Sequence, residues 1–220
     1  MAAAGDLVRR ARHSLLDFDG PVCAVFGALP DHEVADRLRA VLADRCQPVT
    51  GAAATAHDPF EVLAYATELD TPTTQAVEKA FRAAEVEAVR AAPQTPGLPA
   101  VLDHLTSRGL VVTIVSNNSA AAVKTYLHTT GFDRYIGSIS ARTTEDVRHL
   151  KPHPHLLHRA ITLHGTYPGE CLMIGDSITD IHAAGTPVVA YANKPGKHPR
   201  LATHHPDALI DHLTNLLPHH

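Results

Sequence analysis

The sequence predicts an α/β fold in which helices cover a parallel β-sheet and an all-helical segment is inserted near the start. Short apolar strand patterns alternate with helical patterns from residue 97 to residue 211, and one more strand pattern stands alone at residues 14–18. Alternation of this kind is typical of parallel sheets. Residues 31–93 lie between these two parts and show helical spacing without a strand pattern. The insertion is therefore expected directly after the first strand.

Length and composition indicate a folded protein of about one domain. The chain has 220 residues, of which 45% are hydrophobic, and a net charge of −4. This balance excludes general disorder, and no charge-free apolar run is long enough to predict a membrane span. The mild negative charge and the 5% aromatic content argue against nucleic acid and anionic membranes as partners. Three distant cysteines and the lack of a signal-peptide pattern predict a cytoplasmic protein without disulfides.

The insertion is predicted to contain three helices. Residues 31–45 carry apolar side chains at helical spacing. Residues 58–61, Asp-Pro-Phe-Glu, are typical of a helix start, with a capping aspartate and a proline in the first turn. A third helix opens at residues 71–72, Thr-Pro, and is expected to stop near Pro93.

The rest of the chain is predicted to alternate between helices and strands. The apolar, β-branched run at residues 110–115 suits a strand that is buried on both faces. Gly109 and Gly131 are expected to end the helices at residues 99–108 and 119–130, since glycine is common at helix ends. The expected elements are helices at residues 99–108, 119–130 and 154–164, a short helix that ends at Ala184, strands at 110–115, 136–140, 171–174 and 187–191, and a short strand at 208–210 before a C-terminal helix.

Polar residues follow the apolar strands, at the edge where ligands bind in open α/β sheets. The strand at 14–18 leads into Asp-Phe-Asp-Gly, the strand at 110–115 into Ser-Asn-Asn, and the strand at 171–174 into Gly-Asp-Ser. A loop between them supplies the only lysine of this set. The residues expected to converge there are Asp17, Asp19, Ser116, Asn117, Lys151, Asp176 and Asp180.

This combination of side chains is typical of a metal-assisted phosphate site. Clustered carboxylates repel each other, so a cation is needed to keep them ionised together. Ligands that are all oxygen atoms favour Mg²⁺ where phosphate is present. Ser116, together with N–H groups at the start of the next helix, could bind a phosphoryl oxygen, and Lys151 could neutralise another. A carboxylate aimed at phosphorus would make this a phosphoryl-transfer site.

Taken in order, four motifs resemble those of the haloacid dehalogenase-like (HAD) superfamily over almost the whole chain. They are Asp17-x-Asp19-Gly20, Ser116, Lys151-Pro152 and Gly175-Asp176-x-x-x-Asp180. The resemblance implies a Rossmann-like core formed by residues 1–28 and 94–220, with an α-helical cap at residues 29–93. It also implies a Mg²⁺-dependent phosphatase that hydrolyses a small phosphorylated metabolite through an aspartyl-phosphate.

The resemblance further implies a role for each residue of these motifs. Asp17 would be the nucleophile, and Asp19 would act as general acid and base and offer its backbone carbonyl to the metal. Asp17 and Asp176 would ligate Mg²⁺ through their carboxylates, while Asp180 would support the metal site or hold Lys151. The phosphoryl group would be bound by Ser116, Lys151 and the backbone of Asn117.

Alternatives with the same core differ in the fate of the phosphoryl group. A sugar-phosphate mutase (phosphoglucomutase-like) and a non-catalytic phosphate-binding HAD protein both fit the motifs.

Asp19 favours phosphate esters over carbon–halogen cleavage, since the family's dehalogenases lack this second aspartate. Lys79 is the insertion's only lysine and lies on a polar helix face, which disfavours phosphonate cleavage through a Schiff base. Pro21 stands where many members have threonine, and we expect it to alter the loop rather than the chemistry.

Two groups of residues outside the motifs are expected to have no part in the chemistry, and a third group supplies candidates for substrate selection that the sequence alone does not rank. Histidines cluster around Lys151, but the chain has 17 histidines, so an exposed face is expected rather than a metal site. The basic segment at residues 193–197 could border the site and meet the substrate, but a solvated turn is the first expectation. The insertion's candidates for substrate selection are Arg37, Arg39, Arg45, His57, Tyr65 and Glu68.

Overall fold

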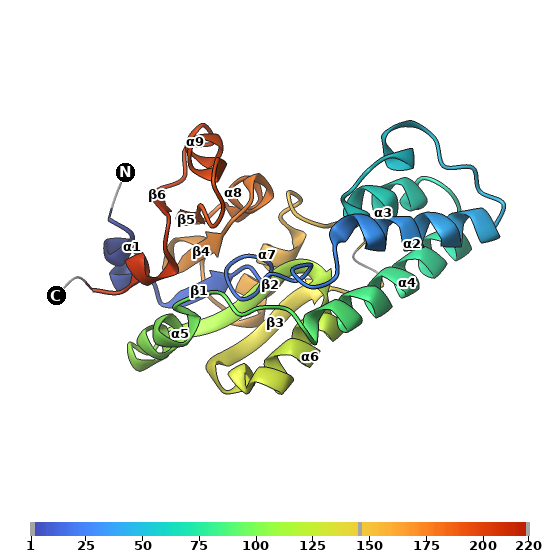
Figure 1. Ribbon diagram of the computed structural model, residues 1–220. Helices are drawn as coiled ribbons and strands as arrows, with labels where there is room; N and C mark the ends of the chain where they lie inside the picture. The colour runs from blue at the N-terminus through green and yellow to red at the C-terminus, as the bar shows by residue number, and fades with distance from the viewer. Residues whose placement is uncertain (1–2, 145–146, 219–220) are drawn as a thin grey trace.

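The computed structural model describes residues 3–144 and 147–218 and confirms the predicted parallel sheet. Within these residues six strands pair in the order β3-β2-β1-β4-β5-β6, with every pair parallel (Figure 1). The strand predicted to stand alone, β1, lies near the middle of the sheet. The strands are β1 (His13–Leu16), β2 (Val111–Ser119), β3 (Ile136–Arg142), β4 (Cys171–Gly175), β5 (Val188–Tyr191) and β6 (Ala208–Ile210).

Helices cover both faces of the sheet, which explains why β4 and β5 and the first half of β2 are almost entirely apolar. Neighbouring residues of β1 point to opposite faces, because side chains alternate along a strand. Leu16 packs on the face covered by α1 (Ala4–Arg10), α5 (Leu98–Ser107) and α6 (Ala120–Thr130). Leu15 packs on the other face, against α7 (His155–Leu163) and α8 (Ile178–Ala184). The core is therefore a three-layer α/β/α arrangement.

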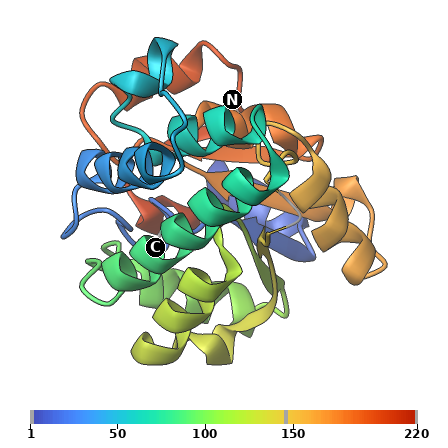
Figure 2. The same ribbon diagram turned by 90° about the vertical axis from the view of Figure 1, so that its right-hand side faces the viewer.

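The insertion after β1 is helical, as predicted, and packs around its own apolar cluster. It comprises α2 (Asp31–Asp44), the 3₁₀ turn η1 (Gly51–Ala54), α3 (Pro59–Thr67) and α4 (Thr71–Val89). Asp58 accepts a hydrogen bond from the Phe60 N–H at the start of α3, and Asp70 does the same for Thr73 in α4. Figure 2 shows these blue to green helices in front of the sheet.

The ends of the chain differ from the prediction. The expected C-terminal helix is only the 3₁₀ turn η4 (Leu213–Leu216), with Pro218 shortly after it to prevent further helix. Two short helices were not predicted, α1 and α9 (Lys197–Ala202), and both are too short for their periodicity to stand out. Among the described residues, no helix combines the length and the apolarity that crossing a membrane requires.

The three central strands lie in matching register where β1 ends. Leu16 of β1 pairs with Ile114 of β2 and with Ile174 of β4. The N–H of the next residue, Asp17, still donates to the carbonyl of Ile174 at 2.9 Å. The residues that follow these strands therefore emerge at one edge of the sheet.

Candidate active site

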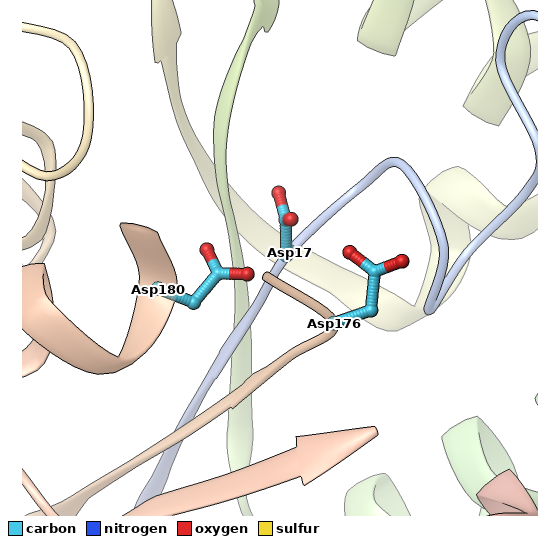
Figure 3. Close-up of side chains that lie close together, drawn as sticks. All are labelled: Asp17, Asp176 and Asp180. Carbon is cyan, nitrogen blue, oxygen red and sulfur yellow. The ribbon is translucent and has the colours of Figure 1, made fainter. Parts of the chain in front are cut away.

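Three aspartates meet at this edge. Asp17 follows β1, Asp176 follows β4, and Asp180 lies in the first turn of α8 (Figure 3). One carboxylate oxygen of each lies within 4.8 Å of those of the other two, and all three residues are buried. Burial raises the pKa of Asp17 well above its ordinary value, and the neighbouring Asp180 carboxylate raises it further. This is the only group of three or more metal-ligating side chains at such spacing in the described part of the chain.

Lys151 lies between two of these carboxylates. Its ammonium is 2.8 Å from Asp17 Oδ1 and 2.6 Å from Asp180 Oδ1, and it donates to the Val115 carbonyl at 3.0 Å. Only 2% of the side chain is exposed. Burial disfavours its charge, but the two carboxylates outweigh this effect and raise the pKa of Lys151 above the usual value. The lysine is therefore a fixed cation beside Asp17.

Asp180 uses both of its oxygens in hydrogen bonds. While Oδ1 contacts Lys151, Oδ2 accepts from the N–H of Ser177 at 3.0 Å and from its hydroxyl at 2.6 Å. Ser177 and Asp180 thereby form a capping box at the start of α8. The structure thus brings Asp180 to Lys151 and engages it in hydrogen bonds on both sides.

Two glycines make room for these carboxylates. A Cβ atom at Gly20 would lie 2.4 Å from Cγ of Asp176, and one at Gly175 would lie 2.3 Å from Oδ2 of Asp180. Gly20 also has a φ of +98°, which side chains rarely tolerate. The close approach of the carboxylates therefore requires glycine at both positions.

Asp19 and Asp176 lie on either side of Gly20. Asp19 Oδ1 accepts from the Val25 N–H at 2.9 Å, and burial raises the pKa of Asp19 to about 6. Asp176 Oδ2 accepts from the Asn193 amide at 2.8 Å and pairs with the ammonium of Lys197. Burial raises the pKa of Asp176 despite the lysine.

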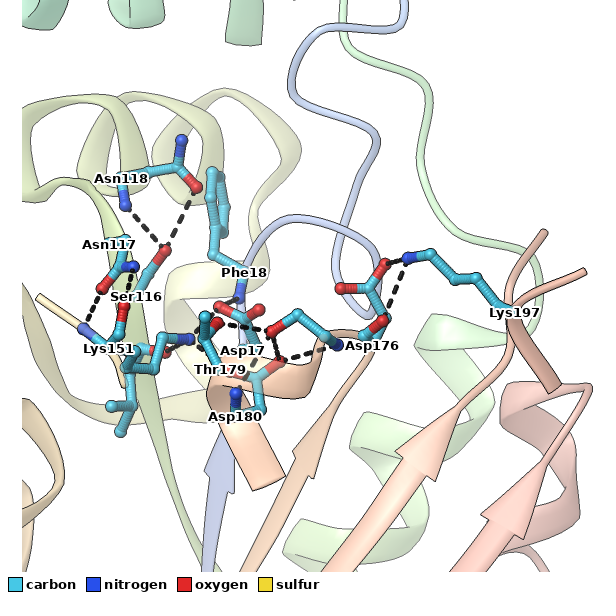
Figure 4. Close-up of polar contacts among 12 residues, drawn as sticks. Asp17, Phe18, Ser116, Asn117, Asn118, Lys151, Asp176, Thr179, Asp180 and Lys197 are labelled. Carbon is cyan, nitrogen blue, oxygen red and sulfur yellow. Dashed lines mark hydrogen bonds and ion pairs between the residues drawn. The ribbon is translucent and has the colours of Figure 1, made fainter. Parts of the chain in front are cut away.

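The expectation of a solvated turn at residues 193–197 is therefore wrong. The Asn193 amide donates to the Asp176 carboxylate. Lys197 pairs with the same carboxylate and also donates to the Asp176 carbonyl at 3.0 Å (Figure 4). Asn193 and Lys197 could have been predicted from the rule used for the other strands, which is that site residues follow the carboxyl ends of parallel strands. This segment follows β5, which ends at the same edge of the sheet.

The last residues of β2, which follow its apolar part, are held by hydrogen bonds on both sides. Ser116 is buried, and its hydroxyl accepts from the Asn118 N–H at 3.1 Å and lies 3.2 Å from Asn118 Oδ1 (Figure 4). The Asn117 amide accepts from the Lys151 N–H at 2.8 Å and donates to the Lys151 carbonyl at 3.0 Å. Ser119 then caps α6. Two hydrogen bonds of Asn117 therefore connect the end of β2, which carries Ser116, to the loop that carries Lys151.

All seven residues expected at this edge are near one cavity of about 300 Å³. Six of them line it directly, and Asp180 lies behind Lys151 and Ser177. The insertion contributes Asp58 and Phe60 to the wall. A second cavity of about 290 Å³ shares Phe60, Asn117 and Lys151 with the first. Its other lining residues are Glu61, Leu63, Ala64, Val147, Arg148 and Leu150.

The insertion's six candidates for substrate selection line neither cavity. Several of them instead make contacts within the insertion: Arg37 pairs with Glu87, Arg39 donates to the carbonyls of Ala53 and Ala56, and Tyr65 donates to that of Pro48. The sequence analysis missed Phe60, because its apolar side chain at a helix start gives no chemical signal. The helix face that covers the site depends on how the insertion packs on the core.

Three of the histidines around Lys151 lie close to one another. The rings of His149, His153 and His155 lie with centroids 5.1 to 6.4 Å apart. In the described residues their nitrogen atoms do not meet the spacing that the three aspartates satisfy. His153 Nδ1 accepts from the His155 N–H at 3.1 Å.

Solved structures share this architecture of a sheet with a helical insertion. A haloacid dehalogenase-like hydrolase from Streptococcus pneumoniae superposes with a TM-score of 0.68 and 15% identity, over 95% of this chain and 98% of that one. CbbY from Rhodobacter sphaeroides, crystallised with phosphate, gives a TM-score of 0.69 and 16% identity, over 94% and 96%. Likeness at these identities shows the fold.

The sequence itself shows the family. Residues 11–185 match the profile of the haloacid dehalogenase-like hydrolases, and the chain belongs to that family. Pyrophosphatase PpaX of Bacillus cereus is 32% identical over 120 residues, which are 53% of this chain and 55% of PpaX. Phosphoglycolate phosphatase of Yersinia pestis is 32% identical over 126 residues, or 56% and 53%. The chain therefore spans about half the length of the curated relatives it matches.

Proposed function

We propose that this protein is a Mg²⁺-dependent phosphatase that hydrolyses a small-molecule phosphate monoester through an aspartyl-phosphate on Asp17. The observation that carries the proposal is the convergence of Asp17, Ser116, Lys151 and Asp176 on one cavity. A carboxylate nucleophile, a hydroxyl, a fixed ammonium and a second carboxylate supply what phosphoryl transfer needs. The relatives named as phosphatases support the same chemistry.

The acidic cluster suits a divalent cation. Asp17 and Asp176 would hold Mg²⁺ through their carboxylates, together with the backbone carbonyl of Asp19. Oδ1 of Asp17 contacts the Phe18 N–H and Lys151, and Oδ2 of Asp176 accepts from Asn193. Figure 3 shows both carboxylates directed away from the strands on the same side. When bound, the ion offsets the repulsion between these carboxylates and neutralises charge on the phosphoryl group. Asp180 keeps its hydrogen bonds and orients Lys151.

The chain's own residues account for both halves of the reaction. The Asp17 carboxylate attacks phosphorus and forms an O–P bond, while the bond to the leaving oxygen breaks and that oxygen takes a proton from Asp19. Asp19 then removes a proton from water, which attacks phosphorus and releases phosphate and the Asp17 carboxylate. Ser116 and Lys151 bind the phosphoryl oxygens throughout. The Val25 N–H fixes the orientation of Asp19.

The second cavity is suited to the leaving group. It adjoins the phosphoryl site through Phe60, Asn117 and Lys151, and most of its wall is apolar. We propose that residues 29–93 form a cap over a core made of residues 1–28 and 94–220, and that Phe60 is the cap's contact with the substrate. The substrate would then be a small phosphorylated metabolite whose organic part enters this cavity. A closed cap would also keep bulk water from the aspartyl-phosphate.

Hydrolysis of p-nitrophenyl phosphate tests this proposal. Wild-type protein should release nitrophenol and phosphate with Mg²⁺, and should lose this activity with EDTA or in Asp17→Asn. Asp133→Asn, an exposed aspartate away from the cavity, is the matched control and should keep full activity. Activity that survives Asp17→Asn would refute the assignment of the nucleophile. Conversion of a sugar phosphate to its isomer without release of phosphate would favour the mutase alternative.

A further inference from the structure

A buried network of charges joins helix α4 of the insertion to the core. Arg142, at the end of β3, donates from Nη1 to Glu78 at 2.8 Å and from Nη2 to Glu85 at 2.6 Å. The exposed fractions of the three side chains are 0%, 1% and 0%. The guanidinium also lies 4.7 Å from the centroid of the Phe81 ring. Ion pairs buried this deeply often stabilise a fold no better than apolar residues of similar size, so stability alone does not account for this network.

The same network contacts residues 117–119, which follow Ser116 at the end of β2. Glu85 Oε2 accepts from the Ser119 N–H at 3.0 Å, and Oε1 accepts from the Asn118 amide at 3.1 Å. Arg142 Nε donates to the Asn117 carbonyl at 3.0 Å. Three consecutive residues after Ser116 are therefore held by one glutamate of the insertion and its arginine partner.

The chemistry of the carboxylate sets the direction of each hydrogen bond. An ionised carboxylate only accepts, so the amide nitrogen of Asn118 must face Glu85. The amide oxygen of Asn118 is then left to face the Ser116 hydroxyl, 3.2 Å away, while the Asn118 N–H donates to the same hydroxyl at 3.1 Å. The position of the Ser116 oxygen thus depends on Asn118, whose orientation depends on Glu85.

We propose that Glu85 and Arg142 are positioning residues for the phosphoryl group, acting through Asn118, Asn117 and Ser116. The proposal rests on the function proposed above, in which Ser116 near the end of β2 binds phosphate. By this route the insertion takes part in holding the phosphoryl group itself, besides its proposed contact with the leaving group. Since Glu85 lies on α4, movement of this helix would alter the affinity for phosphate.

Glu85→Gln tests the arrangement with little change in volume. A glutamine has one acceptor oxygen in place of two, and its NH₂ group would face the donors of Ser119, Asn118 or Arg142. We expect the Kd for inorganic phosphate, measured by calorimetry with Mg²⁺ present, to rise about tenfold. The KM for p-nitrophenyl phosphate should rise in parallel, and the Mg²⁺ concentration that gives half-maximal activity should stay the same.

Two other glutamates on α4 provide controls. Glu87 is exposed and pairs with Arg37 at 2.7 Å, so Glu87→Gln should leave the Tm, the Kd and the KM unchanged. Glu78 is buried and contacts Arg142 but none of residues 116–119, so Glu78→Gln should lower the Tm without raising the Kd for phosphate. A merely structural role for Glu85 predicts instead that Glu85→Gln behaves like Glu78→Gln.

If Glu85→Gln does not fold, Asn118→Ala tests whether the connection to Ser116 contributes to phosphate binding. It removes the connection to Ser116 and leaves the Glu85–Arg142 ion pair in place, and it should raise the Kd by a similar factor. Arg142→Lys, which keeps the charge, should restore part of the affinity lost in Arg142→Met. Wild-type affinity in both Asn118→Ala and Glu85→Gln would overturn the inference alone. A wild-type protein that neither binds phosphate nor hydrolyses the ester would overturn the proposed function along with it.

Discussion

Replacing Gly20 by alanine is expected to disable the site while leaving most of the fold intact. The new Cβ atom would lie 2.4 Å from Cγ of Asp176, whereas ordinary contacts begin at 3.4 Å. The carboxylate would have to move by about 1 Å, and misplacement of that size can cost about 100-fold in rate. Asn193 and Lys197 hold Asp176 from the other side and oppose the movement. We expect kcat/KM to fall about 100-fold.

Gly109→Ala is the matched control for this substitution. Gly109 also has a positive φ, +80°, but a Cβ atom there meets nothing within 4 Å. Both variants should lose about 1–2 kcal/mol of folding free energy from the backbone conformation. For a chain of this size that corresponds to a fall in Tm of about 2–8 °C.

The assay compares kcat/KM for p-nitrophenyl phosphate with the thermal unfolding midpoint of each variant. Gly109→Ala should retain the activity of the wild-type protein at temperatures well below its Tm, and Gly20→Ala should not. The reasoning is refuted if the two variants have similar activity, because the clash with Asp176 is then not what requires glycine.

Three further results are expected. Millimolar Mg²⁺ should raise the Tm of the wild-type protein but not of Asp176→Asn, because a ligand that binds only the folded state stabilises it; equal shifts would argue against this metal site. Phe60→Ala should lower kcat/KM about tenfold for p-nitrophenyl phosphate and much less for acetyl phosphate, whose leaving group is too small to reach the second cavity; equal losses would exclude the proposed contact. Burial and the neighbouring His164 lower the pKa of His13, so the unfolded chain binds more protons below about pH 6.5, and stability should fall as the pH drops from 7 to 5. His13→Gln should reduce this dependence, and an unchanged slope of Tm against pH would contradict the assignment.

The central strands could be predicted because their local pattern is unambiguous. Residues 110–115 and 171–174 are apolar except for the β-branched Thr113. The structure places residues 111–115 in β2 and residues 171–174 in β4, buried under helices on both faces. The helix starts at residues 58–61 and 71–72 were equally clear, because a capping aspartate at Asp58 and a proline in the first turn of each helix are local signals. Features that depend on neighbours in the chain are visible in the sequence.

Short terminal elements were less predictable. The segment after β6 has the leucines of a helix but forms only η4, since Pro218 comes too soon for a longer one. Helix α9 is too short to show a period, and it carries Lys197 to Asp176. A basic segment rich in glycine and proline resembles any solvated turn until its place beside an acidic residue is known.

The sequence by itself determined most of the side chains that meet at the edge of the sheet. Asp17, Ser116 and Asp176 each follow an apolar segment of a strand, and parallel strands of matching register bring these segments together. Only the tertiary structure decided what surrounds them. Glu85 and Arg142 are 57 residues apart, and charged residues on a helix and at a strand end ordinarily face solvent. Their burial beside Asn118 depends on the packing of α4 against α6 and β2, which no local pattern encodes.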